Sequence, residues 1–250
     1  MTVQYDHGRR ITAHYHEMTP LERAIAELEH KAKAYYSTRA ARPEIETSDQ
    51  RVKRENELAA ALSHLKQEKL RALTKIQVQC RLEEYQTASR LASAESSGNR
   101  QERTEARATL AAEGHHPTDK LADFMRMVGR PQPSPRFTAH HIVMGAGKTE
   151  DAARARVQLH FHGIGINDPD NGVWMPMTRA DKGHWAYRRA AAHSQIHTKN
   201  YQRWVWANVQ FMENEQAFRD TLNRIRTDLK NGMQPKKVTE KPDPNWSGNV

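Results

Sequence analysis

Three prolines at alternate positions, Pro131, Pro133 and Pro135, place the strongest constraint on the fold of this 250-residue chain. Because proline fixes φ and has no backbone N–H, neither a helix nor a central strand can run through this stretch. Upstream of it, apolar residues recur at helical spacing, whereas downstream short β-branched runs alternate with helical stretches. The sequence therefore predicts an α+β protein whose N-terminal half is helical.

The N-terminal half has the pattern of a helical hairpin or a short coiled coil. Residues 19–22 (TPLE) are typical of a helix start, because threonine can cap the helix, proline fits the first turn and the glutamate completes a capping box. Apolar residues then recur at helical spacing in two long stretches and one short one. Since no cluster of reactive side chains occurs there, we expect residues 1–114 to form a docking or delivery region.

Basic residues and histidines concentrate in the second half of the chain. Residues 115–250 hold 20 Lys and Arg against 13 Asp and Glu, which is +7 of the net charge of +9, and nine of the 14 histidines lie between residues 115 and 197. A basic surface favours polyanionic partners through counterion release. The single cysteine, Cys80, can form neither an internal disulfide nor a cysteine-rich zinc site, so a metal site must consist of His, Asp, Glu or Asn.

Two adjacent histidines, His140 and His141, lie in a short β-branched run over 137–143 that predicts a strand. Neighbouring side chains on a strand point to opposite faces, so we expect the two imidazoles to serve different partners. A tight turn at Asn171-Gly172 and a second short strand over 173–175 follow.

His193 and His197 lie four residues apart in a stretch of helical character that extends to about residue 230. Side chains at i and i+4 of a helix face the same way, so these two imidazoles can share one metal ion. Residues 232–250 are basic and contain several prolines, which predicts a flexible tail.

One short motif resembles part of an ATP-binding loop but lacks a residue that the loop requires. Residues 147–149 (GKT) resemble the end of a phosphate-binding loop of an ATPase. That loop also requires a glycine five residues before Gly147, where this chain has Ile142, so an ATP site is rejected.

Taken in order, these segments resemble the HNH or ββα-metal endonuclease superfamily, and most closely its branch with an Ala-His-His (AHH) signature that occurs in bacterial polymorphic toxins. The segments that carry the resemblance are 139–143 (AHHIV), 163–168 (GIGIND), 171–176 (NGVWMP) and 193–197 (HSQIH) with Tyr201. Trp174 and Met175 depart from the usual residues but keep their apolar character. The resemblance implies a C-terminal ββα-metal, HNH-type nuclease domain over 115–231.

The resemblance also implies roles for individual residues. His141 is then the general base that takes a proton from water, and Asn171 holds the loop so that His141 is oriented. His140, His193 and His197 bind one divalent metal ion, for which three imidazoles favour Zn²⁺, Ni²⁺ or Mn²⁺ over Mg²⁺. Candidate contacts to the phosphates of the substrate are Lys148, Arg154, Arg179, Arg188 and Arg189.

By the same resemblance, we expect a largely non-specific DNase that acts as an antibacterial toxin and is neutralised by a cognate immunity protein. That partner should be acidic, to match the basic nuclease. Two alternatives remain: an RNase toxin of the same fold, and a non-enzymatic structural-zinc module that binds nucleic acid.

The first twenty residues contain no apolar segment of the kind found in a secretory signal peptide. We therefore expect synthesis in the bacterial cytoplasm, export by a contact-dependent system such as type VI secretion, and activity in the cytoplasm of the target cell. The helical half would then contact a component of the secretion apparatus or a chaperone. No run of the chain reaches the ~18 apolar residues that a membrane-spanning helix needs.

Overall fold

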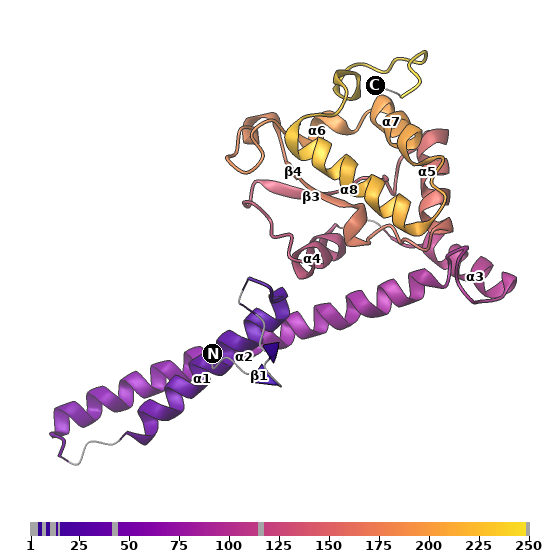
Figure 1. Cartoon of the computed structure of the whole chain (residues 1–250). Coiled ribbons are helices and arrows are strands. Elements are labelled where there is room, and N and C mark those ends of the chain that lie inside the picture. Colours follow the sequence, from indigo (N-terminus) through magenta and orange to yellow (C-terminus); the bar gives the residue numbers. More distant parts are fainter. Residues whose placement is uncertain are drawn as a thin grey trace. The chain divides into compact units, whose positions relative to one another are not determined.

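The computed structural model describes residues 5–6, 9–10, 14, 16–41, 45–114 and 118–248, and Figure 1 labels most of their helices and strands. The chain divides into two compact units. The first comprises residues 1–80 with 127–129, and the second comprises 81–126 with 130–250. The division between the units thus falls after residue 80, inside the long helix α2 (Ser48–Arg90). The sequence predicted a domain boundary further along the chain, after residue 114.

The first unit contains a helical hairpin, as the sequence predicted. Its elements are β1 (Tyr5–Asp6), β2 (Arg9–Arg10), α1 (Pro20–Ala40) and the larger part of α2 (Ser48–Arg90). Helix α1 lies beside α2 (Figure 1), and Lys31 of α1 pairs with Glu68 of α2 at 3.4 Å. The expected capping box starts α1, because Thr19 Oγ1 accepts from Glu22 N at 3.2 Å and the Glu22 carboxylate accepts from Thr19 N at 2.7 Å.

The second unit contains the end of α2 and nearly all later elements. Its helices and strands are α3 (Arg100–Ala111), α4 (Asp119–Met127), β3 (Phe137–His141), α5 (Glu150–Phe161), β4 (Gly172–Pro176), α6 (His193–Ile196), α7 (Lys199–Val209) and α8 (Glu215–Asn231), with the short 3-10 helices η1 (Pro169–Asn171), η2 (Arg179–Asp181) and η3 (Lys236–Thr239). The segment with three prolines has neither helix nor strand, as expected. None of the described helices is both long and apolar enough to cross a membrane.

The second unit begins before residue 114 because helix α3 packs on α5 and the end of α2 packs on the loop that follows α5. The backbone N–H of Ala94 donates to the Phe161 carbonyl at 3.0 Å. Arg107 of α3 donates to the Ala92 carbonyl at 2.8 Å, and its guanidinium lies 4.7 Å from the centre of the Phe161 ring. These contacts attach α3 to the histidine-rich part of the chain, and no sequence pattern indicates them.

Strands β3 and β4 form a small antiparallel sheet in which His140 is opposite Val173 and His141 is opposite Gly172. Helix α4 covers one face, where its Leu121 and Met125 are buried with aromatic residues of the two strands. The main core lies on the other side and contains apolar residues of α5, α7 and α8. The second unit is therefore α+β, with one two-stranded sheet between layers of helix.

The stretch from His193 to residue 230 is three helices, which corrects the expectation of one. Helix α6 ends at Ile196, and His197 follows it with non-helical backbone angles. Thr198 then caps α7 by accepting from Tyr201 N at 3.0 Å, and Asn214 caps α8 by accepting from Ala217 N at 2.8 Å. Such side chains compete with the helical hydrogen bonds and start new helices, which apolar periodicity alone does not reveal.

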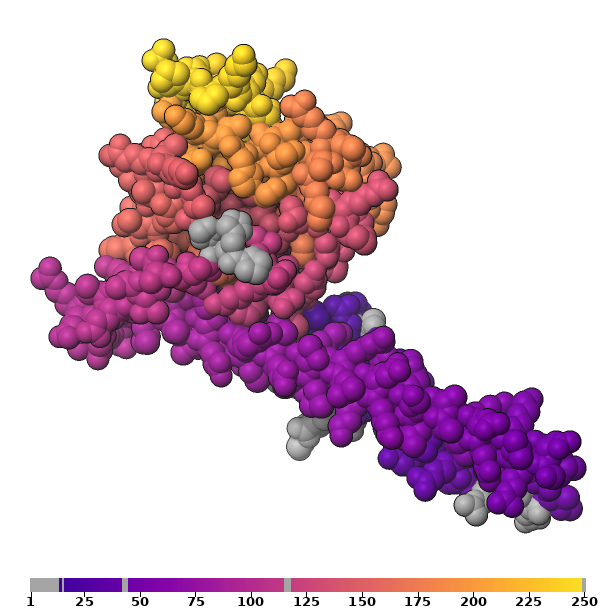
Figure 2. Space-filling model, turned by 180° about the vertical axis from the view of Figure 1, so that it is seen from behind, coloured from indigo at the N-terminus to yellow at the C-terminus, as the bar shows by residue number. Residues whose placement is uncertain are grey.

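The expected flexible tail is packed instead, as far as it is described (232–248). Val238 is fully buried in the main core, and Asn200 of α7 donates to the carbonyls of Lys237 and Lys241 at 2.7 and 3.0 Å. Arg203 of α7 donates to three further carbonyls between residues 243 and 246. Helix α7 therefore supplies side-chain donors to five carbonyls of this proline-containing segment, which fixes it to the rest of the second unit. Figure 2 shows this segment lying directly against the residues that precede it.

Candidate active site and metal centre

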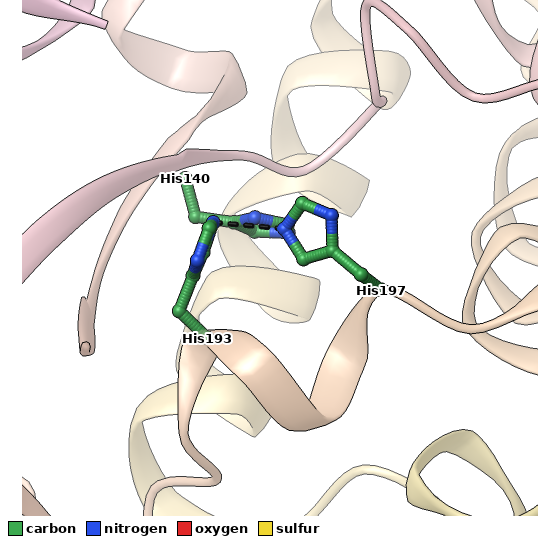
Figure 3. Close-up of side chains that lie close together, drawn as sticks. All are labelled: His140, His193 and His197. Atoms are coloured by element: carbon green, nitrogen blue, oxygen red, sulfur yellow. Dashed lines mark hydrogen bonds between the residues drawn. The ribbon is translucent and has the colours of Figure 1, made fainter. Parts of the chain in front are cut away.

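Three histidine side chains meet at one point of the second unit (Figure 3). His140 comes from β3, His193 begins α6 and His197 directly follows α6. Each offers one ring nitrogen, and these three atoms lie within 4.8 Å of one another. The Nε2 atoms of His193 and His197 are 2.8 Å apart. The structure therefore brings together all three of the metal ligands that the sequence predicted.

The ring of His140 is held from the side of α7. Tyr201 is fully buried, donates its hydroxyl to the Ile142 carbonyl at 2.9 Å and contacts His140 Nε2 at 3.0 Å. Burial, and then the neighbouring imidazoles of His193 and His197, hold the pKa of His140 well below its usual range. His140 is therefore neutral at physiological pH, the state in which an imidazole can bind a metal.

The donor set of this group fits a divalent metal ion. Three imidazole nitrogens suit the nitrogen-preferring first-row metals, and fewer than four protein ligands leave a position open, as catalytic metal sites require. Within the described part of the chain, this is the one group of His, Cys, Asp or Glu residues with such an arrangement. Cys80 is exposed and lies outside it.

His141 points to a different partner from that of its neighbour, as strand alternation predicts. Its Nε2 lies 3.0 Å from the amide oxygen of Asn167, and its side chain is buried. His141 and the three metal-binding candidates nevertheless line the same cavity, whose volume is about 620 Å³. A water molecule or a phosphodiester in this cavity would therefore meet both the base candidate and the metal centre.

Asn167, which sequence reasoning did not single out, is the side chain that reaches His141. Its amide nitrogen donates to Glu113 Oε1 at 2.9 Å and to the Gly114 carbonyl at 3.0 Å. Its backbone N–H donates to the Tyr85 hydroxyl at 3.0 Å. The only feature of the sequence that pointed to Asn167 was its place in the 163–168 segment, after Gly163 and Gly165 and before the turn.

Asn171 holds the loop after β3, in line with the role inferred from the resemblance, but its side chain bonds to backbone groups of Val143 and Ile166 and not to the His141 ring. Its amide oxygen accepts from Val143 N at 2.7 Å, and its amide nitrogen donates to the carbonyls of Val143 and Ile166 at 3.1 and 2.9 Å. Asn171 thereby joins the chain after His141 to the chain before Asn167. The Asn171 side chain thus holds the backbone next to His141, whereas the Asn167 side chain contacts the His141 ring.

The loop between Asn167 and Asn171 is anchored by arginines. Asp170 pairs with Arg130 and with Arg219 at 2.8 Å each, and the fully buried Asp168 pairs with Arg219 at 3.2 Å. Although burial raises it, the hydrogen bonds from Arg130 and Arg219 hold the pKa of Asp170 below its usual value. Both asparagines are thus attached to a loop that is fixed by ion pairs at its centre.

The predicted phosphate contacts differ in their positions. Lys148 lines the cavity, and Lys199, which the sequence analysis missed, lines it as well. Arg154 is exposed on α5 and pairs with Glu150 of the same helix. The other three candidates are exposed and do not line the cavity: Arg179, Arg188 and Arg189.

Comparison with known families agrees with this site. Residues 121–231 match AHH, a nuclease family of the HNH/ENDO VII superfamily with conserved AHH. The AHH segment at 139–141 and all three candidate metal ligands lie inside the matched range. This part of the chain is therefore a nuclease domain of the HNH/ENDO VII superfamily. Within that superfamily it is of the AHH type, which confirms the resemblance seen in the sequence, and the protein is an enzyme, a metal-dependent endonuclease. No curated protein and no solved structure matches the chain significantly.

Proposed function

We propose that this protein is a largely non-specific DNase that acts as an antibacterial toxin. The observation that carries the enzymatic part is the shared cavity, in which a base candidate, His141, lies beside three clustered imidazoles. Lys148 and Lys199 add positive charge to the same cavity, which suits the phosphates of a nucleic acid. A structural-zinc module would need the imidazoles but not His141.

In this proposal His141 takes the proton from the attacking water, since an imidazole is a suitable base at neutral pH. His140, His193 and His197 hold the divalent ion, which when bound stabilises the charge that develops on the phosphate and on the leaving oxygen. Asn167 orients the His141 ring, and Asn171 fixes the backbone that carries it. Lys148 and Lys199 attract and position the phosphate backbone.

The identity of the metal follows from the ligand chemistry in this proposal. Three neutral nitrogen ligands favour Zn²⁺, Ni²⁺ or Mn²⁺, whereas Mg²⁺ prefers oxygen ligands and an octahedral shell. No carboxylate of the described residues belongs to the histidine group. Mg²⁺ should therefore restore activity least well after the metal has been removed.

The biological role is proposed from the toxin branch that the motifs resemble. An acidic immunity protein would protect the producing cell, because a basic nuclease binds an acidic inhibitor fast and tightly. The helical hairpin would contact a component of a contact-dependent secretion system or a chaperone. The enzyme would then act in the cytoplasm of the target cell.

Digestion of plasmid DNA and of total RNA by the purified protein, with and without EDTA, tests the enzymatic proposal. We expect nicked and then linear plasmid, no cleavage with EDTA, and recovery with Zn²⁺, Ni²⁺ or Mn²⁺. The matched control is the variant His141→Ala, prepared in parallel to exclude a contaminating nuclease. Cleavage of RNA alone would replace the DNase by the RNase alternative, and absence of all cleavage with intact metal and DNA binding would favour the structural module.

Expression in a bacterial cytoplasm tests the toxin role. We expect the wild-type chain to arrest growth and fragment the chromosome, and the His141→Ala chain to be harmless at the same expression level. Normal growth with an active wild-type enzyme in the cytoplasm would contradict the toxin proposal while leaving the nuclease proposal in place.

A further inference from the structure

We propose that Glu113 and Tyr85, both upstream of the matched nuclease segment, are positioning residues for His141. Through Asn167 they hold the His141 ring in one tautomer, with its hydrogen on Nε2 and its lone pair on Nδ1. The inference rests on the proposed role of His141 as the general base. It adds two residues that neither the AHH motif nor the metal group contains, and it assigns the basic atom.

The first step is the orientation of the Asn167 amide. Its nitrogen faces Glu113 Oε1 at 2.9 Å and the Gly114 carbonyl at 3.0 Å. A carboxylate and a backbone carbonyl can only accept hydrogen bonds, so an amide turned by 180° would place its oxygen against two acceptors. Glu113 and Gly114 therefore fix which end of the amide faces His141.

The second step is the tautomer of His141. The Asn167 atom that faces the ring is the amide oxygen, 3.0 Å from Nε2. An amide oxygen can only accept, so Nε2 must carry the hydrogen, and a neutral imidazole has only one N–H. The lone pair, and with it the basicity that a general base needs, is then on Nδ1.

The third step is the stability of Glu113 in this position. Its Oε2 accepts from the Tyr85 hydroxyl at 2.6 Å, and its Oε1 is 2.6 Å from Lys120 Nζ. Burial, and then the charge of Glu113, raise the pKa of Tyr85, so the phenol stays protonated and donates. Tyr85 also accepts from the Asn167 backbone N–H at 3.0 Å, so one phenol contacts both Glu113 and the Asn167 backbone.

The fourth step is the origin of these residues. Tyr85 lies near the end of α2 and Glu113 just after α3, whereas the matched nuclease segment begins at residue 121. Both belong to the same compact unit as His141. Within the described residues, the side chain that fixes the Asn167 amide is thus supplied by chain that the family match does not include.

The tautomer can be measured directly in the full-length protein labelled with ¹⁵N-histidine. Long-range ¹H–¹⁵N spectra distinguish the two neutral tautomers by their nitrogen shifts, and His141→Ala identifies the signal of His141. We expect wild type to show hydrogen on Nε2, and Glu113→Ala and Asn167→Ala to show a mixture of tautomers. The matched control is Glu105→Ala, because Glu105 is an exposed carboxylate of α3 that bonds only to Gln101 among the residues described.

Cleavage kinetics provide the second readout. We expect Glu113→Ala to lower kcat by about 10–100-fold, the range seen when an outer-shell partner that orients a site residue is lost, with KM changed less than about twofold. Glu113→Gln keeps one acceptor for the Asn167 amide and should recover part of kcat and of the Nε2–H tautomer. Tyr85→Phe removes only a hydroxyl, so it serves if Glu113→Ala does not fold, as judged by circular dichroism.

The outcomes separate this inference from the proposed function. An unchanged tautomer and an unchanged kcat in Glu113→Ala or, if that variant does not fold, in Tyr85→Phe would overturn the inference, even if His141→Ala abolishes cleavage. Full cleavage by His141→Ala would instead overturn the role of His141 as the base, whatever the tautomer. A shifted tautomer together with a reduced kcat, in a variant with native circular dichroism, supports the inference.

Discussion

Gly165 and Tyr85 are packed so closely that a β-carbon at Gly165 would overlap the phenol hydroxyl. This contact brings the end of α2 against the loop that carries Asn167, and the Tyr85 hydroxyl then bonds to the Asn167 backbone. Gly163 makes a similar approach one helical turn further along, where its β-carbon would meet Ser89 and Ser93. Docking against the end of α2 therefore explains Gly165, and Gly163 is favoured both by this docking and by its left-handed backbone, with φ 67°.

We predict that Gly165→Ala destabilises the protein and lowers cleavage. The added methyl group must displace the Tyr85 ring, and overpacking of this kind costs about 1–3 kcal/mol. Thermal and urea unfolding measure the first effect, and plasmid nicking measures the second. Gly114→Ala is the matched control for stability alone, because no described atom lies within 4 Å of a β-carbon there, whereas its carbonyl accepts from Asn167. Equal stability of the two variants would show that the Tyr85 contact is not tight in solution.

We predict that His141→Ala lowers the rate of cleavage by about 10²–10⁴-fold, because that is the usual contribution of a general base. Its metal content should stay near that of wild type, since His141 contacts Asn167 and lies outside the metal group. Plasmid digestion and elemental analysis of the purified variant check the two parts. Loss of the ion from this variant would reassign His141 as a metal ligand.

We predict that replacing His193 or His197 by alanine weakens metal binding and cleavage together. With one imidazole removed, only two of the three protein ligands remain for the ion. The loss in metal affinity should therefore exceed the roughly 10–100-fold effect of replacing a residue that only bonds to a ligand. Circular dichroism should look native, because His197 follows α6 and alanine is a better helix former than histidine at His193.

His184 provides the control for the metal ligands. Its ring contacts Phe137 at 5.2 Å between centroids, and it is not part of the histidine group. His184→Ala should therefore bind metal as wild type does. Stoichiometric metal and full cleavage in His197→Ala would show that the group in Figure 3 is not the metal centre.

We predict that residues 81–250 fold and cleave DNA alone, whereas residues 115–250 do not. The shorter fragment lacks Tyr85, Glu113 and the packing of α3 on α5. Expression, thermal unfolding and plasmid digestion of both fragments check this directly. Wild-type activity in the shorter fragment would show that the upstream contacts are dispensable for both folding and catalysis.

We predict that Lys148→Ala weakens DNA binding about equally for all sequences. Loss of one phosphate contact should also reduce the slope of log affinity against log salt by about 1. Binding of an inactive His141→Ala background to short duplexes at several salt concentrations measures both. Arg154→Ala should have the smaller effect, because its guanidinium pairs with Glu150.

The sequence predicted those parts of the molecule that depend on local patterns. The capping box at Thr19 and the strand with two histidines follow from local pattern, and the structure has them. His193 and His197 also meet as their spacing predicted, although α6 ends before His197. The one-helix expectation after His193 was wrong because single polar caps, here at Thr198 and Asn214, interrupt a continuous apolar pattern.

The missed features depend on contacts between distant segments. Asn167 meets Glu113 and Tyr85 across 54 and 82 residues of chain, and no spacing rule indicates such a meeting. Val238 enters the core from a segment whose prolines and charges are typical of a flexible tail. In both cases the position of the residue depends on a distant segment of the same chain. A single sequence does not show which segments will meet.

The position of Tyr85 also has a consequence for any transfer of this nuclease domain to another chain. A junction placed at residue 121, where the family match begins, would leave Tyr85 and Glu113 out of the transferred segment. A transferred segment that keeps both contacts must therefore begin upstream of Tyr85, inside α2. Insertion of one residue between Tyr85 and Ser89 would turn one contact away from the other by about 100°, so that Gly163 and Gly165 could no longer both dock. We therefore expect that an insertion in the last turns of α2 disrupts this docking, whereas one in an exposed loop does not.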